Sequence, residues 1–329
     1  MTGNGGGGMT GDGPGPVAAA IEAARGLFEL PQELVIDTVV ARRIIVEFIR
    51  GQLRQAGFER ALLGLSGGID SAVVACLAAE AVGPERLLCL VMPYRTSAAE
   101  SRRDAEAVIG RLGCASRVVD ISPMVDAYFG EADAADAGVD GGAAGVAGVL
   151  GAEGSGASAV RRGNLMARVR MSVLYDFSVT WGGLVVGTGN KTETLIGYTT
   201  VFGDSACAFN PVGDLYKSQL RQLAVELGVP RGIIAKAPSA DLWPGQTDEG
   251  EVGFSYAEVD RLLYWMVDRR LTRDELVGRG FDGGFVDRVS RMVAGSEFKR
   301  QVPPIAKLGP RTSGVDYLYP RRRPRSGEG

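Results

Sequence analysis

The sequence predicts an α/β protein in which a parallel sheet carries helices on both faces. Two observations lead to this fold class. Short apolar runs alternate with segments of helical periodicity between residues 61 and 187, which is the pattern of repeated strand–helix–strand units. The first and the last of these apolar runs each lead into a glycine-containing turn. Ligands of parallel sheets bind beyond the carboxyl ends of the strands, so these two turns are the first places to look for function.

Four apolar runs bounded by turn residues predict strands, at 61–65, 86–92, 116–121 and 184–187. Apolar residues at helical spacing predict helices at 32–56, 71–82, 97–112 and 163–180, and a second group at 217–227, 256–269, 273–278 and 284–294. We expect the second group of helices to pack on one edge of the sheet and not to form a domain of its own.

We expect one domain over residues 17–310, because 329 residues with 45% hydrophobic content can build one large core. The Gly/Pro-rich residues 1–16 predict a disordered tail, and residues 311–329 predict a C-terminal tail. Between residues 132 and 160, 18 of the 29 residues are Gly or Ala and none is Lys or Arg. This composition predicts a flexible insertion, which is either a mobile cover over a ligand or inert disorder.

Composition excludes several classes of function. The formal net charge is −3, and the basic run at 321–325 stands alone near the C-terminus, which disfavours a nucleic-acid-binding surface. No apolar run approaches the roughly 18 residues that span a membrane, and no apolar h-region follows the N-terminus, so we expect neither a membrane span nor a signal peptide. The cysteines lack CxxC spacing, which predicts buried thiols in a reducing compartment. They are Cys76, Cys89, Cys114 and Cys207. We therefore expect a cytoplasmic protein with neither nucleic-acid nor membrane partners.

The run from Gly64 to Ser71 is the most informative in the chain. Its residues are Gly64, Leu65, Ser66, Gly67, Gly68, Ile69, Asp70 and Ser71, and they stand between a predicted strand and a predicted helix. Main-chain N–H groups of such a turn form an anion site together with the first turn of the following helix. The paired glycines let phosphate approach the main chain, the two serines add hydroxyl donors, and Asp70 offers a carboxylate to a hard cation. We predict an ATP pyrophosphate loop here.

The same run also satisfies G-x-S-x-G, the nucleophile elbow of α/β-hydrolases, in the strand–turn–helix context that this motif needs. The chain contains no histidine. A Ser–His–Asp triad is therefore excluded, and the hydrolase interpretation with it.

A second apolar strand, at 184–187, leads into a turn that ends at Glu193. It is no Walker A loop, because Asn190 stands where the glycine before the lysine is required. Asp70 and Glu193 both follow the carboxyl end of a strand, so we expect them to reach one site. Two carboxylates and phosphate oxygens make a magnesium site of the usual kind, which predicts Mg²⁺ as a cofactor and ATP as a co-substrate.

Six motifs in a fixed order make a resemblance to a known family specific. They are the SGGIDS loop, GNLMARVRM at 163–171, Gly187-Thr188 with Glu193, FGD at 202–204, PSADL at 238–242 and KRQVP at 299–303. Over about residues 32–306 the chain resembles NAD synthetase, of the N-type ATP pyrophosphatase superfamily. The resemblance implies a Rossmann-like, adenine nucleotide α-hydrolase-like fold and a cytoplasmic homodimer with the dinucleotide bound near the subunit interface. The implied activity is that of an ammonia-dependent ligase, which amidates nicotinic acid adenine dinucleotide (deamido-NAD) to NAD through an acyl-adenylate and releases AMP and pyrophosphate.

The resemblance also implies roles for individual residues. The loop residues would bind ATP together with Thr188, Lys217 and Ser239, and Asp70, Glu193 and Lys217 would form the catalytic group, with the first two on the metal. The positions that would bind deamido-NAD are Asn164, Arg168, Asp204 and Lys299. Asn164 and Arg168 are four apart on one predicted helix and share a face, whereas Arg170 is expected to point elsewhere, with a structural ion pair as one open interpretation.

Four positions depart from the family pattern, and they are Val91, Val201, Ala208 and Phe298. Many members carry Arg, Lys, Asp and His there, in that order. The phosphate and metal end is thus intact, while parts of the nicotinate and adenine ends differ. Either the same acceptor is recognised in another way, or the acceptor has changed. We favour the first, because Asn164, Arg168 and the 238–242 stretch are present.

Other functions stay open from the sequence. An adenylating enzyme with the same loop, GMP synthetase-like or tRNA-modifying, is the nearest rival, and a non-catalytic nucleotide sensor is a second. A sensor has no need of both Asp70 and Glu193, so the pair favours catalysis. Glutamine-dependent relatives carry a nitrilase-like amidase domain first, and the residues before Gly64 are too few for it and hold no cysteine. We therefore expect free ammonia, or ammonia from a separate glutaminase.

Overall fold

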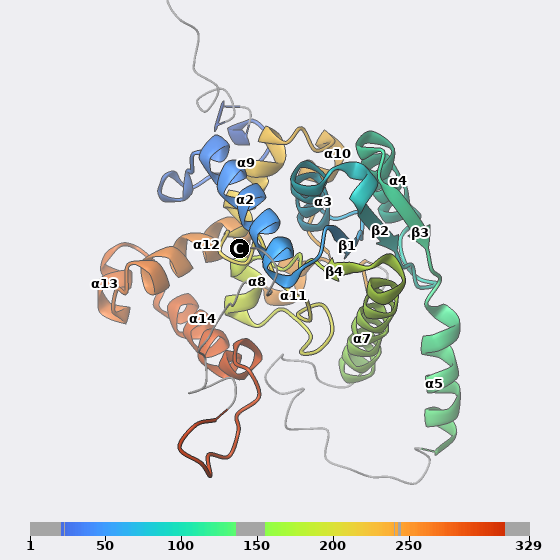
Figure 1. Cartoon of the computed structure of the whole chain (residues 1–329). Helices are drawn as coiled ribbons and strands as arrows, with labels where there is room; N and C mark the ends of the chain where they lie inside the picture. The colour runs from blue at the N-terminus through green and yellow to red at the C-terminus, as the bar shows by residue number, and fades with distance from the viewer. Residues whose placement is uncertain (1–20, 23, 136–154, 240, 243–244, 313–329) are drawn as a thin grey trace, which may run out of the picture.

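The protein is built around a four-stranded parallel sheet (Figure 1). The computed structural model describes residues 21–22, 24–135, 155–239, 241–242 and 245–312. The strands are β1 (Arg60–Gly64), β2 (Leu87–Val91), β3 (Ala115–Val118) and β4 (Gly183–Val185), in the spatial order β3-β2-β1-β4. Because β1 lies between β2 and β4, its carboxyl end opens at the centre of the sheet, with the ends of its two neighbours on either side.

Helices cover both faces of the sheet, as the sequence predicts. Alternate residues of β1 point in opposite directions, because side chains alternate along a strand. Leu63 belongs to the hydrophobic cluster on one face, with α2 (Thr38–Ala56), α3 (Ile69–Val82), α4 (Ala99–Leu112) and α9 (Lys217–Glu226). Leu62 belongs to the cluster on the other face, with α5 (Ser122–Ala135) and α7 (Ser155–Trp181).

The remaining elements are short helices, most of them after β4. They are η1 (Gln32–Leu34), η2 (Pro84–Arg86), α8 (Lys191–Ile196), α10 (Arg231–Ala235), α11 (Asp248–Val252), α12 (Tyr256–Leu263), the π-helical turn η4 (Tyr264–Asp268), α13 (Arg273–Gly278), α14 (Gly283–Gly295) and η5 (Glu297–Arg300). The C-terminal helices share a hydrophobic cluster of their own and lie on the opposite side of the molecule from α5 (Figure 1). Helix α12 contacts α8 and α9, so the C-terminal cluster packs against the two helices that begin at Lys191 and Lys217.

Several boundaries differ from the prediction. The helix expected from residue 32 begins at Thr38, because the Asp37 side chain accepts a hydrogen bond from Val40 N–H and caps it there. The helix expected at 256–269 ends as an α-helix at Leu263 and continues as η4. Helix α5 was not predicted, because its exposed and apolar residues give little periodicity.

The predicted insertion at 132–160 is partly wrong. Residues 132–135 complete α5, and residues 155–160 begin α7, which is therefore longer than the predicted helix. The rest of the insertion, at 136–154, lies outside the described residues, as do the predicted tail 1–16 and most of the C-terminal tail. Among the described residues no helix is long and apolar enough to cross a membrane.

Candidate active site

The predicted phosphate loop, within residues 64–71, leaves β1 and enters α3, which is the expected strand–turn–helix order. Leu65 N–H still donates to Leu90 O (2.8 Å), which holds the loop's entry in line with the sheet. Gly67 has φ +83°, and a Cβ there would collide with the backbone of Ser101, so only glycine fits. Helix α3 starts without a side-chain cap, because its N-cap residue is Gly68. The N–H groups of its first turn are left for a ligand.

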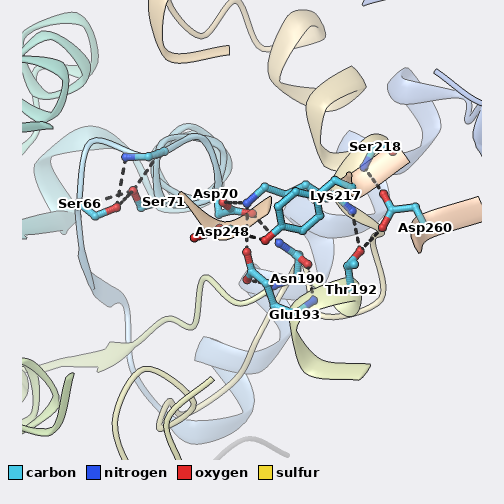
Figure 2. A network of polar contacts seen from close by, with 12 residues as sticks. Ser66, Asp70, Ser71, Asn190, Thr192, Glu193, Lys217, Ser218, Asp248 and Asp260 are labelled. Atoms are coloured by element: carbon cyan, nitrogen blue, oxygen red, sulfur yellow. Dashed lines mark hydrogen bonds and ion pairs between the residues drawn. The ribbon is translucent and has the colours of Figure 1, made fainter. Parts of the chain in front are cut away.

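The two serines of the loop brace it from inside. Ser71 Oγ donates to Gly68 O (3.0 Å), and Ser66 N–H donates to Ser71 Oγ (3.2 Å). Ser66 Oγ in turn accepts from Gly68 N–H (3.2 Å) and lies 3.1 Å from Ser71 Oγ (Figure 2). The hydroxyls therefore fix the shape of the loop in addition to any contact with phosphate.

Lys217 joins the two carboxylates that the sequence pairs. Its Nζ lies 2.6 Å from Asp70 Oδ2 and 3.0 Å from Glu193 Oε1, and its side chain is only 2% exposed (Figure 2). Asn190 contacts both carboxylates as well: its Nδ2 donates to Asp70 Oδ1 (2.9 Å) and its backbone N–H to Glu193 Oε2 (3.3 Å). Residues from α3, α8 and α9, distant in sequence, thus meet at one point.

The electrostatics of this cluster follow from its burial. Desolvation raises the pKa of Glu193 to about 7; Lys217 opposes that rise, whereas Asp70 and Asp248 add to it. Burial by itself lowers the pKa of Lys217, but Asp70 and then Glu193 outweigh it, and the pKa stands above its ordinary range. Burial also raises the pKa of Asp248. Three carboxyl groups therefore surround one ammonium.

A second layer of residues, which the sequence analysis did not predict, holds Lys217 and Glu193 in place. Asp260 of α12 is fully buried, accepts from Thr192 Oγ1 (2.5 Å) and also accepts from Ser218 N–H (2.7 Å). Thr192 precedes Glu193, and Ser218 follows Lys217. One carboxylate therefore ties the starts of α8 and α9 together.

Tyr256, also on α12, contacts both the Lys217 ammonium and Asp248. Its hydroxyl donates to Asp248 Oδ2 (3.0 Å), and Lys217 Nζ lies 4.9 Å from the centre of its ring. No motif marks Asp248, Tyr256 or Asp260. Helix α12 also carries Glu258 and Arg261, so a polar residue on it is only a weak signal of function.

The pair Asp70 and Glu193 fits a magnesium ion. One cation, the Lys217 ammonium, already lies within 3.0 Å of both carboxylates, so they are close enough to share another. Each carboxylate oxygen accepts one hydrogen bond and can accept a further contact. The described residues offer no group of three or more metal-binding side chains. Two protein carboxylates, completed by substrate phosphates and water, are what Mg²⁺ commonly uses.

The four residues predicted to bind deamido-NAD all contact one loop, at residues 197–205. Asp204 folds this loop: its Oδ1 accepts from Thr200 N–H (2.7 Å) and its Oδ2 from Thr199 Oγ1 (2.7 Å). Lys299 Nζ donates to Gly197 O (2.7 Å) and to Thr199 O (2.9 Å). Asp204 therefore stabilises the 197–205 loop by hydrogen bonds inside it, and Lys299 does so by hydrogen bonds to its main chain.

Two side chains of helix α7 form hydrogen bonds with the same loop. Asn164 Oδ1 accepts from Thr200 Oγ1 (2.8 Å), and Arg168 Nε donates to Val201 O (3.3 Å). The contact to residue 201 uses the main chain, which valine offers as well as lysine. Phe202, beside it, has φ +59° and an exposed ring.

A cavity of about 1500 Å³ connects the two ends of the site. All residues predicted to bind ATP, the metal or deamido-NAD line it, from the phosphate loop through Thr188 and Ser239 to Lys299. Val91, Val201 and Phe298, three of the four departures, line it as well, whereas Ala208 does not. The volume exceeds the 300–1,000 Å³ range that is common for single small ligands, which suits two large ligands side by side.

Arg170 lies on the cavity, contrary to the expectation that it points elsewhere. Its Nε donates to Met92 O (3.1 Å), at the end of β2. A structural ion pair is not formed with any residue in the described part of the chain.

Comparison with known proteins identifies a family. The profile of NAD synthase matches residues 41–303. The NH(3)-dependent NAD(+) synthetase of Trichlorobacter lovleyi is 50% identical over 288 residues, covering 88% of this chain and 97% of the relative. That of Chlorobaculum tepidum is 48% identical over 291 residues, with the same coverage.

Solved structures agree with the sequence matches. An NH3-dependent NAD synthetase from Campylobacter jejuni, in complex with the nitrate ion, has a TM-score of 0.65 and 30% identity, covering 83% of this chain and 100% of that one. The structure of NMN synthetase from Francisella tularensis has a TM-score of 0.68 and 29% identity, with the same coverage.

Proposed function

The chain belongs to the NAD synthase family, and from that premise we propose that it amidates deamido-NAD to NAD with ATP and ammonia. The observation that carries the proposal is the Asp70–Lys217–Glu193 cluster beside the phosphate loop, in a cavity that continues to the 197–205 loop. This geometry suits a reaction in which a nucleoside triphosphate binds at one end of the cavity and a second large substrate binds at the other, with their reacting groups between.

The chemistry proceeds in two steps. A carboxylate oxygen of the acceptor attacks the α-phosphorus of ATP, and the bond to the bridging oxygen breaks, which gives an acyl-adenylate and pyrophosphate. Ammonia then attacks the acyl carbon, AMP leaves, and the nitrogen loses a proton. Both steps need positioned reactants and neutralised phosphate charge but no covalent enzyme nucleophile, which is consistent with a chain free of histidine.

The proposed roles follow from the contacts. The main-chain N–H groups of Gly67 and of the first turn of α3, which the serine hydroxyls do not engage, bind the β- and γ-phosphates. Lys217, fixed by Asp70, Glu193 and Tyr256, adds a positive charge next to them. Asp70 and Glu193 would hold Mg²⁺, which when bound stabilises the negative charge of the leaving pyrophosphate. Thr188 and Ser239, on the same cavity wall, contact the rest of ATP.

The acceptor is the point on which relatives differ. The Trichlorobacter relative is named for NAD(+) and the Francisella structure for NMN, which names a mononucleotide product. We propose the dinucleotide, because the cavity is large and because the relatives of higher identity carry the NAD(+) name. Asn164, Arg168, Asp204 and Lys299 act on it through the 197–205 loop or directly.

We also propose a homodimer. Val40, Ile44 and Phe48 form an exposed apolar stripe at i, i+4 and i+8 on α2, with Ile44 63% exposed. Such a stripe on a two-fold interface would be covered by its own copy. Ile44→Glu should shift the sedimentation coefficient from dimer to monomer; an unchanged dimer would move the interface elsewhere.

Residues 17–310 act as one unit in this proposal, because the site draws side chains from α3 to η5. The described cysteines are free thiols, which supports a reducing, cytoplasmic location. Ammonia would come from solution or from a separate amidase.

The test is product formation from ATP, Mg²⁺ and acceptor, with ammonium chloride or glutamine as nitrogen donor. NAD and AMP in equal amounts with ammonium alone support the proposal. Nicotinic acid mononucleotide as a parallel acceptor tests the narrower claim: faster turnover of the mononucleotide would reassign the substrate. No AMP with either acceptor would favour a rival adenylating enzyme or a nucleotide sensor.

A further inference from the structure

Arg170 is a cation whose charge the described protein leaves without a direct ion pair. It lies half-buried on α7, and its Nε is held by Met92 O (3.1 Å). Its two terminal nitrogens make no hydrogen bond and no ion pair with the residues that the structure describes. The backbone contact holds Nε of the guanidinium, and Arg170 is among the residues that line the cavity.

Two carboxylates lie near Arg170, and both are engaged elsewhere. Asp241 accepts from Ala98 N–H with both oxygens (3.2 and 3.1 Å), and Asp204 accepts from the main chain and a hydroxyl of its own loop. They raise the pKa of Arg170 less than burial lowers it. Neither carboxylate forms an ion pair with Arg170 in the described part of the chain, so its guanidinium can pair with an incoming anion.

Helix α7 carries Arg170 to the junction between the two ends of the cavity. One turn further on, Leu174 packs at the start of the phosphate loop, where a Cβ on Gly64 would lie 3.6 Å from Leu174 Cδ1 and 3.2 Å from Met92 Cε. In the other direction, a Cβ on Gly203 of the 197–205 loop would lie 3.0 Å from Ala167 Cβ. Arg170 stands between these two contacts.

We propose that Arg170 binds a substrate oxyanion at this junction. The inference rests on the proposed function, which requires the acceptor carboxylate and the ATP α-phosphate to meet between the two ends of the cavity. The phosphate loop and Lys217 already serve the outer phosphates, and Arg168 Nε and Lys299 Nζ donate to the main chain of the 197–205 loop. A guanidinium held at Nε presents two parallel donors, the geometry that a carboxylate accepts in bidentate fashion.

Arg170 would then favour substrate over product. Amidation converts the anionic carboxylate into a neutral carboxamide, which forms weaker hydrogen bonds with a guanidinium. Deamido-NAD and NAD differ at this one group, so they are a matched pair of probes for the charge that Arg170 recognises.

The test is calorimetric titration of wild type, Arg170→Gln and Arg170→Lys with deamido-NAD, NAD and AMP in separate experiments. We expect Arg170→Gln to bind deamido-NAD about 10- to 100-fold more weakly and NAD within about twofold of wild type. Arg170→Lys keeps the positive charge but loses the two parallel donors of the guanidinium. Its affinity for deamido-NAD should lie between those of wild type and Arg170→Gln. A loss confined to AMP would identify the α-phosphate as the oxyanion instead.

Arg162→Gln is the control, because Arg162 is on the same helix but contacts Tyr94 Oη (3.3 Å) and Phe129, away from the cavity lining. It should leave all three affinities unchanged. Unchanged affinities of both Arg170 variants for all three ligands would overturn the inference. If wild type binds AMP but not deamido-NAD, the proposed acceptor fails, while the AMP titrations of the variants still decide whether Arg170 binds an oxyanion.

Discussion

The two ends of the cavity are built in opposite ways. At the phosphate end the predicted residues contact one another: Asp70 and Glu193 meet on Lys217. At the acceptor end the predicted residues contact a loop: Asn164 and Lys299 bind the side chain and main chain of residues 197–205 and do not touch each other. The first end is a charged cluster, and the second is a braced stretch of backbone.

This difference explains which substitutions each end tolerates. A charge cluster depends on the identity of every member, because removing one changes the balance of charge around a buried ammonium. A braced backbone depends on main-chain atoms, which any residue supplies. Val201 contributes its carbonyl oxygen to Arg168, so the departure from lysine there leaves this contact intact. Two of the four departures from the family pattern, Val201 in this loop and Phe298 beside Lys299, accordingly lie at the acceptor end.

The largest expected effect is at the phosphate end. Asp70→Asn should lower kcat at least about 1,000-fold with the fold intact, because it removes charge from both the metal pair and the Lys217 ion pair. Pyrophosphate release measures it. Asp214→Asn is the matched control, since Asp214 is a 97% exposed carboxylate that pairs with Lys191. Turnover near wild type in Asp70→Asn would break the distinction between the two ends.

The layer behind the cluster gives the next effect. Burial raises the pKa of Asp260 from 3.8 to about 6, so the native state keeps a proton that the unfolded chain loses between those values. Stability should therefore fall as pH rises through this window, by about 3 kcal/mol at 1.36 kcal/mol per unit of pKa. Asp260→Asn has no titrating carboxyl group there, so its free energy of unfolding should lack this pH-dependent contribution. Urea unfolding of both proteins from pH 4 to 7 measures the difference, and a difference that is flat with pH would contradict the assignment.

At the acceptor end, Arg168→Ala should raise KM for deamido-NAD about tenfold and leave KM for ATP within about twofold, because one charge-assisted contact is lost at that end alone. Steady-state kinetics with each substrate varied in turn measure the split. Equal increases in both constants would move Arg168 out of the acceptor end.

The smallest effect tests the braced backbone itself. Thr200→Val removes the hydroxyl that donates to Asn164 and keeps the side-chain shape. One neutral hydrogen bond predicts about a threefold rise in KM for deamido-NAD with kcat unchanged. Ser178→Ala, which removes a hydroxyl at the far end of α7, is the control. A loss of kcat would show that the loop takes part in the chemical step.

The sequence predicts that Asp70 and Glu193 reach one site, and in the structure both lie within 3.0 Å of Lys217 Nζ. Asp70 and Glu193 could be predicted because each follows a strand that an apolar run indicates. Lys217 was predicted from the family resemblance. Asp260 could not be found in this way, because its partners Thr192 and Ser218 lie on other helices and no local pattern links them. The direction of Arg170 was predicted wrongly from helical spacing, since its Nε donates to the backbone oxygen of Met92, just after β2.

The same limit applies to the fold. The parallel sheet and its two helical layers follow from hydrophobic periodicity. Short helices such as α8 (Lys191–Ile196) and α11 (Asp248–Val252) do not, because five or six residues give too little periodicity and their ends are set by capping side chains.

The central claim, that the two ends meet in an acyl-adenylate, has a direct test. Deamido-NAD labelled with ¹⁸O in its carboxylate is converted with ATP and ammonium, and the products are analysed by mass spectrometry. The account predicts one ¹⁸O atom in AMP and none in pyrophosphate, because the acceptor oxygen attacks the α-phosphorus. Label in orthophosphate, or no label in AMP, would contradict it.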